Sequence, residues 1–431
     1  MLKAIILIGG PQKGTRFRPL SLDIPKPLFP VAGLPLIQHH IEACVSIEEL
    51  KEILLVGFYP AAQIQQFVND LQHQYNVTIK YLQEFTALGT AGGLYHFRDQ
   101  IRYGNPDAFF VMNGDVCADF PLDELYKFHK SLNNPLVTIM GTEATKPQSL
   151  HYGCMVTNKT THEVTHYVEK PSSYVSTLIN CGIYVFSLDI FHTIGDVFNA
   201  KQQDCYRNGN SSREAGYIQL EQEILAPLAG TGKLFALQVT KWWSQLKTAG
   251  SAIYANRHYL ELYRTKHPER LRQPNSAGDS CTIYPDVHID PTTVIHNSAV
   301  LGPNVSIGSG VVVGPGVRIR ESIILSDAVI NDHSLILHSI VGRNSRIGTW
   351  ARVEGTPSDP DPNKAFAKME NPPLFNNDGR LNPSITILGS FISEFLSCGC
   401  AVSVPAETIL LNSIVLPNKE LSRSIKNEII L

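Results

Sequence analysis

Residues 282–325 read TIYPDVHIDPTTVIHNSAVLGPNVSIGSGVVVGPGVRIRESIIL, and this stretch decides the fold of the C-terminal third of the chain. Branched apolar residues return at every sixth position, which is neither the period of an α-helix nor the alternation of an ordinary strand. A period of six is typical of coils whose flat faces each use six residues and stack one column inward. The stretch therefore predicts a left-handed parallel β-helix. Its first inward column is Ile283, Ile289, Ile295, Leu301, Ile307, Val313, Ile319 and Leu325, and a second runs two residues earlier through Val287, Ala299, Val305, Val311, Val317 and Ile323.

The same period extends toward the C-terminus with two interruptions. We expect its phase to slip after Leu337 and to resume at Val341, Ile347 and Val353. Residues 355–383, rich in Pro, Asn and Asp, then break the pattern, and insertions of this length are usually functional or disordered. We therefore predict a β-helix over 283–431 with an inserted loop at 355–383, while residues 391–400 have no period that we can assign.

The N-terminal part has a different rhythm. Short apolar runs such as AIILIGG (4–10) and EILLVGF (52–58) alternate with helix-like segments at 36–44 and 63–75, and further strands are expected at 77–82, 108–113 and 136–141. Continuous apolar runs of this kind favour parallel strands that are buried on both faces. We predict a doubly wound, mostly parallel, Rossmann-like α/β domain over 1–265, followed by a polar linker at 266–282.

Composition excludes several classes of protein. The 431 residues carry a formal net charge of −3, which does not favour nucleic acid as a partner. No stretch approaches the roughly 18 apolar residues that a membrane-spanning helix needs, and no secretory signal is visible, so we expect no membrane association. The eight cysteines are scattered, which favours free thiols in a cytoplasmic protein over disulfides or a zinc site.

The segment GGPQKGTRFRPLSLDIPKPL (9–28) follows the first expected strand and can bind phosphate groups. Its glycines let the backbone approach a ligand closely, and amide N–H groups in such a loop can point at phosphate oxygens. Cations follow at Lys13, Arg16, Arg18 and Lys26. The segment is neither a Walker A loop nor a dinucleotide-binding fingerprint. A plain glycine turn with solvated charges is the alternative.

This segment and four others carry a resemblance. Together with LGTAGGL (88–94), MNGDV (112–116), YVEKP (167–171) and NCGIYVF (180–186), it resembles the sugar-1-phosphate nucleotidyltransferases. With the hexapeptide-repeat tail, the chain is similar over its whole length to the GDP-mannose pyrophosphorylases, in particular to their alpha subunits. The resemblance implies in-line attack of a sugar 1-phosphate on a nucleoside triphosphate, a reaction catalysed mainly by positioning and charge neutralisation.

The resemblance also implies roles for individual residues. Arg16 and Lys26 are the family's catalytic positions and would grip the triphosphate, while Asp115 would hold Mg²⁺. Glu169 would contact sugar hydroxyls and Lys170 the sugar phosphate. The remaining positions would bind the nucleotide-sugar, GDP-mannose: Gly9, Gly10, Gly14, Glu84, Gly89, Asn113, Gly153, Asn180, Gly182 and Gln245.

Two departures from the family pattern point away from catalysis. Active members carry an aspartate in a W-x-D-I-G segment that completes the metal site, whereas this chain reads KWWSQLKT (241–248), with Gln245 at the aspartate position and Lys247 at that of the glycine. A neutral amide is a poorer ligand for a hard dication than a carboxylate. The glycine loop is also two residues longer than the common form and includes Pro11 and Lys13. We therefore expect at most a partial Mg²⁺ site.

Three functions remain open from the sequence. The first is a regulatory subunit that binds GDP-mannose and mediates feedback inhibition of a catalytic beta subunit of GDP-mannose pyrophosphorylase, in homo- and hetero-oligomers. The second is an active mannose-1-phosphate guanylyltransferase, in which water or another carboxylate supplies the missing metal ligand. The third is an acyltransferase on the β-helix, for which the histidines qualify only by residue type: His288, His296, His333 and His338.

Overall fold

The computed structural model describes residues 1–10, 15–208, 216–272, 281–356 and 396–430. Their contacts divide the chain into two compact units. The first comprises Met1–Gly14, Pro25–Phe29 and Leu34–Leu246, and the second comprises Thr15–Ile24, Pro30–Gly33 and Lys247–Leu431. The limits predicted from sequence, 1–265 and 283–431, remain a prediction about domains.

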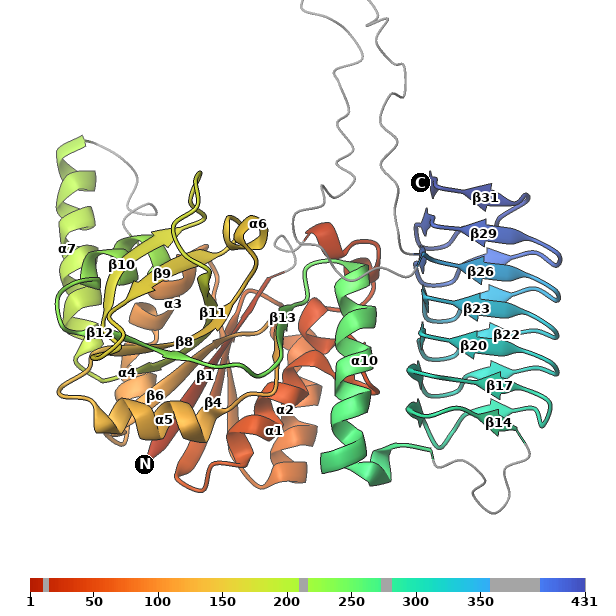
Figure 1. The fold of residues 1–431 in the computed structure, drawn as a ribbon, viewed down its shortest axis with the longest axis horizontal. Helices are drawn as coiled ribbons and strands as arrows, with labels where there is room; N and C mark the ends of the chain where they lie inside the picture. The colour runs from red at the N-terminus through yellow and green to blue at the C-terminus, as the bar shows by residue number, and fades with distance from the viewer. Residues whose placement is uncertain (11–14, 209–215, 273–280, 357–395, 431) are drawn as a thin grey trace, which may run out of the picture. The chain divides into compact units, whose positions relative to one another are not determined.

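The first unit is built on a nine-stranded twisted sheet (Figure 1). Strands β6, β1, β4 and β5 are parallel, as the buried apolar runs predicted, whereas β11 runs antiparallel to β6, β8 and β9. The sheet is therefore a parallel Rossmann-like half continued by a mixed half, in which β12 pairs with β8 in parallel. Its strands are β1 (Leu2–Gly9), β4 (Leu50–Gly57), β5 (Thr78–Gln83), β6 (Ala108–Asn113), β8 (Val137–Glu143), β9 (Gly153–Thr157), β10 (Val164–Glu169), β11 (Leu178–Phe186) and β12 (Leu234–Gln238).

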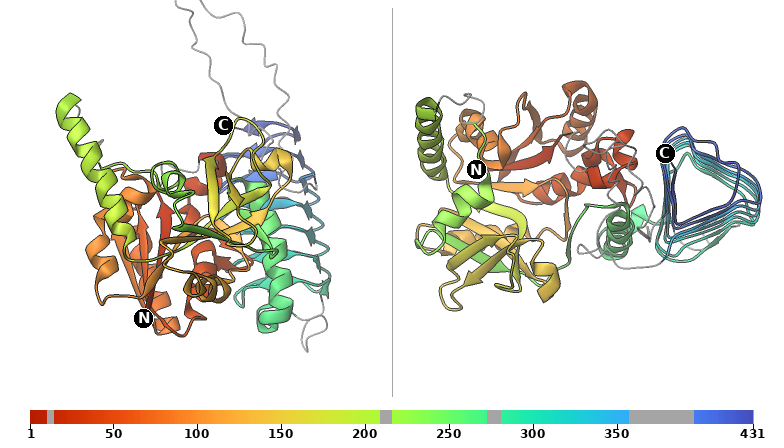
Figure 2. Two further views of the ribbon diagram at one scale, coloured as in Figure 1. Left: turned by 60° about the vertical axis from the view of Figure 1, so that its left-hand side comes forward. Right: turned by 90° about the horizontal axis from the view of Figure 1, so that it is seen from above.

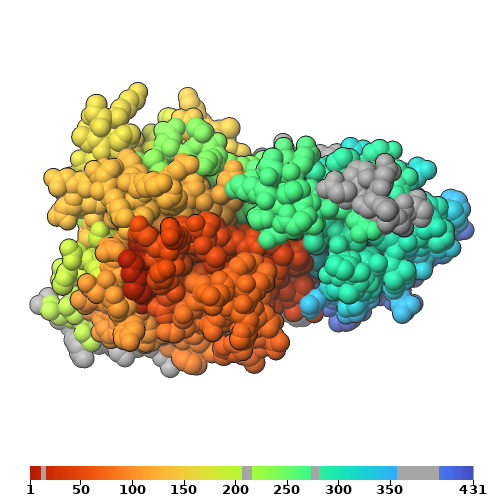
Figure 3. Space-filling model, turned by 90° about the horizontal axis from the view of Figure 1, so that it is seen from below, coloured from red at the N-terminus to blue at the C-terminus, as the bar shows by residue number. Residues whose placement is uncertain are grey.

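Helices cover both faces of this sheet and close two apolar cores. Helices α1 (Leu36–Val45), α2 (Ala61–Tyr75) and α5 (Leu122–Ser131) bury apolar side chains on one face, while α3 (Gly89–His96), α7 (Ile190–Asn208) and the π-helix η4 (Leu220–Leu225) do so on the other. The segment that contains α1, α2 and α5 forms much of the surface of this unit in Figure 3. The unit also contains η3 (Lys26–Leu28), β3 (Leu34–Pro35), α4 (Arg98–Arg102), β7 (Val116–Ala118), α6 (Lys146–Ser149), α9 (Ala226–Leu228) and β13 (Trp243–Gln245).

The second unit contains the predicted β-helix, a stack of triangular coils of short parallel strands that is consistent with the left-handed form (Figure 2). One face is β14 (Thr282–Ile283), β17 (Val300–Leu301), β20 (Arg318–Arg320), β23 (Leu335–Leu337), β26 (Arg352–Glu354), β29 (Ile409–Leu411) and β31 (Ile425–Lys426). The second is β15 (Val287–Ile289), β18 (Val305–Ile307), β21 (Ile323–Ile324), β24 (Ser339–Val341), β27 (Leu396–Cys398), β30 (Ile414–Val415) and β32 (Ile429–Ile430). The third is β16 (Val294–Ile295), β19 (Val312–Val313), β22 (Val329–Ile330), β25 (Arg346–Ile347) and β28 (Ser403–Val404).

The inward column follows the prediction up to Ile319, and then the prediction is wrong by one residue. Ile307 pairs with Ile324, so Ile324 and not Leu325 continues the column, and Ile323 pairs with Ser306 instead of lying in the second column. The phase slips at this corner, well before Leu337. The cause is a coil that is one residue shorter than the coil before it.

The long insertion stands at one corner of the β-helix. In one coil the strands β23 and β24 are separated by His338 alone, whereas one coil later β26 ends at Glu354 and β27 begins at Leu396. The stack is continuous across this position, because β26 pairs with β29 and β24 pairs with β27. Residues 357–383 of the predicted loop lie outside the described residues. Of the 391–400 segment, Cys398 is an inward residue of the column and is fully buried.

Helix α10 (Ala249–Lys266) belongs to the second unit by its contacts and packs beside the β-helix. Arg264 forms an ion pair with buried Asp286, and Arg257 Nε lies 3.0 Å from Glu321 Oε2. The other short elements of this unit are η1 (Thr15–Phe17), η2 (Leu20–Leu22), β2 (Pro30–Val31) and η5 (Pro268–Arg270). All eight cysteines are free thiols. Among the described residues, no helix has both the length and the apolar character needed to cross a membrane.

Candidate functional site

The glycine loop begins where β1 ends, at the carboxyl edge of the parallel strands. Gly9 has φ +68°, a conformation that favours glycine, and a Cβ placed there would meet no atom of the described residues within 4 Å. Gly10 lies against the next strand, since a Cβ on it would come within 2.7 Å of Phe58 Cβ. Gly14, Pro11 and Lys13 lie outside the described residues, and Arg16 is an exposed residue of the second unit.

Glu84 and Gly89 lie at the end of β5 and the start of α3. A Cβ on Gly93 would come within 2.3 Å of Glu84 Oε1, so the carboxyl group of Glu84 lies directly against α3. Gly89 has φ +73°, and a Cβ there would meet the carbonyl oxygen of Ile218 at 2.4 Å. That carbonyl accepts the backbone N–H groups of Ala91 and Gly92. Gly89 is therefore required for the packing of α3, whatever ligand the pocket takes.

Lys26 and Asp115 form an ion pair. Asp115 lies in the turn between β6 and β7, and its Oδ2 is 3.2 Å from Lys26 Nζ. The Asp115 side chain is 35% exposed and the Lys26 side chain 13%, so the carboxylate still has access to solvent. The ammonium group neutralises the same carboxylate that the family resemblance assigns to Mg²⁺.

Gln245 lies beside Asp115, where the resemblance puts the second metal-binding carboxylate. In β13 it pairs with Val116, and the backbone N–H of the next residue, Leu246, donates to the Asp115 carbonyl at 2.7 Å. The Oε1 atom of Gln245 is buried and accepts no hydrogen bond from any described residue. A buried amide oxygen with no donor is unfavourable, which is expected of a group whose partner is a ligand. Lys247 belongs to the second unit.

These donors do not fit Mg²⁺. The ion prefers octahedral oxygen ligands, usually with carboxylates among them. Here one carboxylate is already paired with an ammonium group and the neighbouring donor is a neutral amide. Within the part of the chain that the structure describes, no three His, Cys, Asp or Glu side chains are grouped to hold a metal ion.

The predicted sugar-side residues come together on β9, β10 and β11. Asn180 is 8% exposed, and its Nδ2 donates to the hydroxyls of Tyr167 and Tyr184 at 3.0 and 2.8 Å. The Tyr167 hydroxyl donates to Glu169 Oε2 at 3.0 Å, and Lys170 Nζ lies 3.2 Å from Glu169 Oε1. A carboxylate held in this way presents acceptors for ligand hydroxyl groups.

The sugar-side and metal-side residues are joined through β11. Gly182 has φ +73° at an irregularity of this strand, and a Cβ on it would lie 2.5 Å from Nδ2 of Asn113, which precedes Asp115 by two residues. From the other side, Trp243 Nε1 donates to the Cys181 carbonyl at 2.9 Å. The structure thus brings Asn113, Asp115, Gly182 and Gln245 into one region of the first unit.

Sequence reasoning missed several buried groups at this site. His40 is fully buried between the carbonyl oxygens of Leu36 and Asn113, and burial lowers its pKa to about 4. Glu221, on η4, lies 3.4 Å from the Thr90 hydroxyl, and burial, followed by the proximity of Glu169, raises its pKa. No spacing in the sequence marks either residue. Tyr167 is the first residue of the YVEKP motif, but the motif does not reveal that its hydroxyl lies beside Asn180.

The β-helix histidines have structural surroundings. Nδ1 of half-buried His288 lies 3.0 Å from the Arg270 carbonyl, and His333 stacks on Trp350 with ring centroids 4.4 Å apart. Nδ1 of His296 lies 3.0 Å from the Ser298 hydroxyl, while His338 turns a corner with φ +46°. Three of these histidines thus have contacts within the second unit, and the fourth occupies a left-handed corner position.

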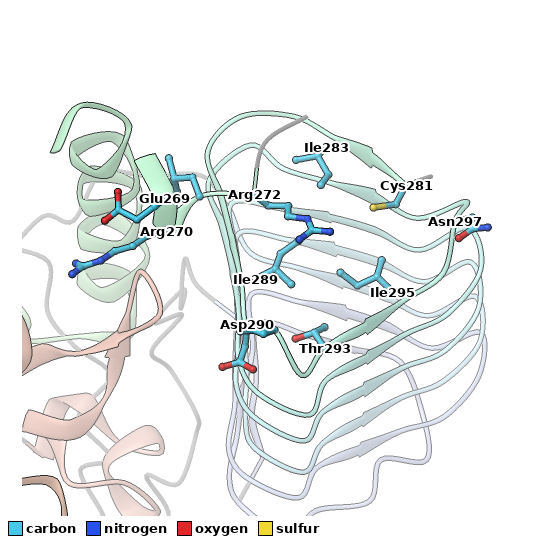
Figure 4. Close-up of a pocket in the computed structure, with 12 residues that line it drawn as sticks. Glu269, Arg270, Arg272, Cys281, Ile283, Ile289, Asp290, Thr293, Ile295 and Asn297 are labelled. Carbon is cyan, nitrogen blue, oxygen red and sulfur yellow. The ribbon is translucent and has the colours of Figure 1, made fainter. Parts of the chain in front are cut away.

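A cavity of about 380 Å³ lies at the first coil of the β-helix, within the second unit (Figure 4). The first inward residues, Ile283, Ile289 and Ile295, form its apolar wall, and Arg272 extends across it. None of the predicted site residues lines this cavity. It is the open end of the apolar column.

The fold and the first unit's site define a class: a nucleotidyltransferase domain followed by a hexapeptide-repeat β-helix. The Nucleotidyl transferase family matches residues 3–213, and the GMPPB C-terminal domain matches residues 283–431. The chain belongs to the family of mannose-1-phosphate guanylyltransferase regulatory alpha subunits.

Full-length relatives establish this membership. The Mannose-1-phosphate guanylyltransferase regulatory subunit alpha of Drosophila melanogaster is 66% identical, and that of Rattus norvegicus is 55% identical. The Mannose-1-phosphate guanyltransferase alpha-A of Xenopus laevis is 57% identical. In each case the match covers 100% of both chains. A solved structure from Bacillus anthracis, assigned as a glucose-1-phosphate thymidylyltransferase, matches with a TM-score of 0.49 and 20% identity over 62% of this chain and 96% of that one.

Proposed function

We propose that this chain is a regulatory subunit that binds GDP-mannose and, when it is bound, restrains a catalytic beta subunit in a cytoplasmic hetero-oligomer. The names of the relatives support a regulatory role and a mannose-1-phosphate guanylyltransferase partner. The observation that carries the proposal is the neutral amide of Gln245 beside an Asp115 carboxylate that is already paired with Lys26. Binding groups are retained here, while the charge needed to hold Mg²⁺ is not.

Different residues bind different parts of the ligand. Backbone amides at Gly9 and Gly10 approach the phosphates, and Lys26 and Lys170 supply positive charge. Glu169, held by Tyr167, accepts hydrogen bonds from sugar hydroxyls. Glu84 lines the nucleotide pocket, and the buried Oε1 of Gln245 accepts a hydrogen bond from a ligand donor. No bond of the ligand is made or broken in this assignment.

An active mannose-1-phosphate guanylyltransferase is the second candidate, because Lys26, Asp115 and Lys170 are all present. An assay of the purified chain with GTP, mannose 1-phosphate and Mg²⁺ separates the two. We expect no pyrophosphate release above background. Robust Mg²⁺-dependent release by the unchanged chain would establish catalysis and overturn the regulatory proposal.

The variant Gln245→Asp tests the observation that carries the proposal. It adds a carboxylate beside Asp115, so we expect measurable binding of Mn²⁺, a spectroscopically visible substitute for Mg²⁺, where the unchanged chain binds none. Gln245→Asn is the matched control, since it has the length of aspartate without its charge. Equal Mn²⁺ binding by the unchanged chain, the control and the variant would show that Gln245 is not what weakens the metal site.

A further inference from the structure

A chain of buried polar groups crosses the three strands on the sugar side of the site. Tyr184, Asn180 and Tyr167 are 0%, 8% and 6% exposed, and they are linked by hydrogen bonds of 2.8 and 3.0 Å. The chain ends at Glu169 Oε2, 3.0 Å from the Tyr167 hydroxyl. Buried networks in which every member is satisfied hold side chains in a single arrangement.

The direction of these hydrogen bonds is fixed by the backbone. The N–H of Gly182 can only donate, and it lies 2.8 Å from the side-chain oxygen of Asn180. The Asn180 NH₂ group must therefore be the donor to both tyrosine hydroxyls. Because the Tyr167 oxygen accepts from Asn180, its own hydrogen is available to Glu169. The Tyr167 hydroxyl is a fixed donor to one carboxylate oxygen.

Gly153 leaves the space that this arrangement requires. A Cβ on Gly153 would lie 2.1 Å from the Tyr167 hydroxyl oxygen and 2.7 Å from Glu169 Oε2. Contacts under 3.0 Å cannot be accommodated without a shift. The resemblance implied that Gly153 binds the nucleotide-sugar. We infer that its contribution is indirect, because the absence of a side chain leaves room for the Tyr167 hydroxyl and the Glu169 carboxylate.

Glu169 is held at both of its oxygens. Tyr167 donates to Oε2, and Lys170 Nζ lies 3.2 Å from Oε1, while the Glu169 side chain keeps 17% exposure. Lys170 is 66% exposed and is a weak constraint, since exposed ion pairs contribute little. The buried tyrosine is thus the contact that determines where the carboxylate points.

We propose that Tyr167 is a positioning residue, which orients Glu169 toward the sugar and so sets how strongly the site prefers a nucleotide-sugar to the bare nucleotide. This inference rests on the proposed function, because it concerns the same pocket. Positioning of this kind affects only ligands that reach Glu169. The nucleotide portion of the ligand does not depend on it.

Calorimetric titrations of the full chain with GDP-mannose and with GDP test the inference. Tyr167→Phe removes one hydroxyl oxygen. We expect this variant to bind GDP-mannose about tenfold more weakly and its affinity for GDP to change by less than about twofold. Tyr184→Phe is the matched control, because it removes the other hydroxyl on Asn180 and leaves the contact with Glu169 in place. If Tyr167→Phe lowers the affinities for GDP-mannose and for GDP by the same factor, or lowers neither affinity, the inference is overturned.

A double-mutant cycle guards against a variant that merely folds poorly. Glu169→Ala is measured in the unchanged chain and in Tyr167→Phe, and the two losses of GDP-mannose affinity are expected not to add, because each substitution removes the same hydrogen bond between Tyr167 and Glu169. Additive losses contradict the positioning role. If the unchanged chain binds GDP but not GDP-mannose, the proposed function itself fails, and the positioning role fails with it.

Discussion

At the scale of single residues, the region around Asp115 combines a carboxylate, an ammonium group and a neutral amide. The turn after β6 and the pairing of β13 with β7 bring the Asp115 and Gln245 positions together. A neutral amide at Gln245 and the ammonium group of Lys26, 3.2 Å away, lie beside this carboxylate. Our proposal attributes the loss of catalysis to position 245, where the resemblance puts a carboxylate.

Burial of His129 leads us to predict how the free energy of unfolding depends on pH. Its ring lies 2.8 Å from the Thr138 hydroxyl and 3.2 Å from that of Ser187, which itself donates to the Pro135 carbonyl at 2.6 Å. The neutral ring is thus satisfied, with Nε2–H donating to Ser187, and burial lowers the pKa of His129 to about 4. Because the unfolded chain takes up this proton near pH 6.5 and the folded chain does not, stability falls as pH drops from about 6.5 to about 4.

Urea unfolding between pH 7 and pH 5 measures this effect. We expect His129 to account for a loss on the order of 1–2 kcal/mol over that interval. In His129→Gln the dependence on pH is shallower, while His192→Gln, at an exposed position of α7, is the control. Identical slopes for all three proteins would exclude a buried neutral His129.

At the scale of elements, a column of serines closes the shortened corners of the β-helix. Leu301 pairs with Ile319 eighteen residues on, whereas Ile319 pairs with Ile336 seventeen residues on. At this corner the Ser322 hydroxyl donates to the Arg320 carbonyl at 2.6 Å and accepts the N–H of Ser339 at 3.2 Å. Ser339 repeats the first of these bonds on the next coil, with the Leu337 carbonyl at 2.6 Å.

Removal of one hydroxyl tests this arrangement. Ser322→Ala leaves the buried N–H of Ser339 without its acceptor, and we expect the β-helix to lose about 1–3 kcal/mol of unfolding free energy. Ser309→Ala, at an exposed corner where the hydroxyl donates to the Ser326 hydroxyl, is expected to change stability by less than about 0.5 kcal/mol. Equal effects of the two substitutions would show that the buried serines do not hold the short corners.

Sequence predicted the elements well and their long-range contacts poorly. The six-residue period identified the β-helix, because each coil repeats the same local requirement. It failed at Ile323-Ile324-Leu325, where a strict period of six selects Leu325, whereas the coil is one residue shorter and Ile324 pairs with Ile307 of the preceding coil. Likewise, the motif containing Tyr167 was visible, whereas its hydrogen bond to Asn180 depends on the pairing of distant strands.

At the scale of the whole molecule, the described strands of the β-helix stack continuously across the corner at which the long insertion stands. The coils on either side of the insertion pair directly, and Thr356 Oγ1 donates to Asn412 Oδ1 at 3.0 Å where the described chain stops. The stack is therefore complete without the residues that follow. A long loop on a rigid scaffold is a common location for partner recognition.

Replacement of residues 357–383 by a short Gly/Ser linker tests that role. We expect an unchanged melting temperature and unchanged GDP-mannose affinity, because the described coils pair with one another across the insertion, together with loss of feedback inhibition of the beta subunit. Pyrophosphate release by the beta subunit, with and without GDP-mannose, provides the measurement. Inhibition equal to that by the complete chain would assign the regulatory contact to another surface.

If this site holds a nucleotide-sugar without a metal ion, the affinity for GDP-mannose does not depend on Mg²⁺. GDP-mannose is titrated into the purified chain in EDTA and again in excess Mg²⁺, with heat as the readout. We expect saturable binding with the same affinity in both conditions. Binding that is absent in EDTA and restored by Mg²⁺ would show that the site needs the metal ion.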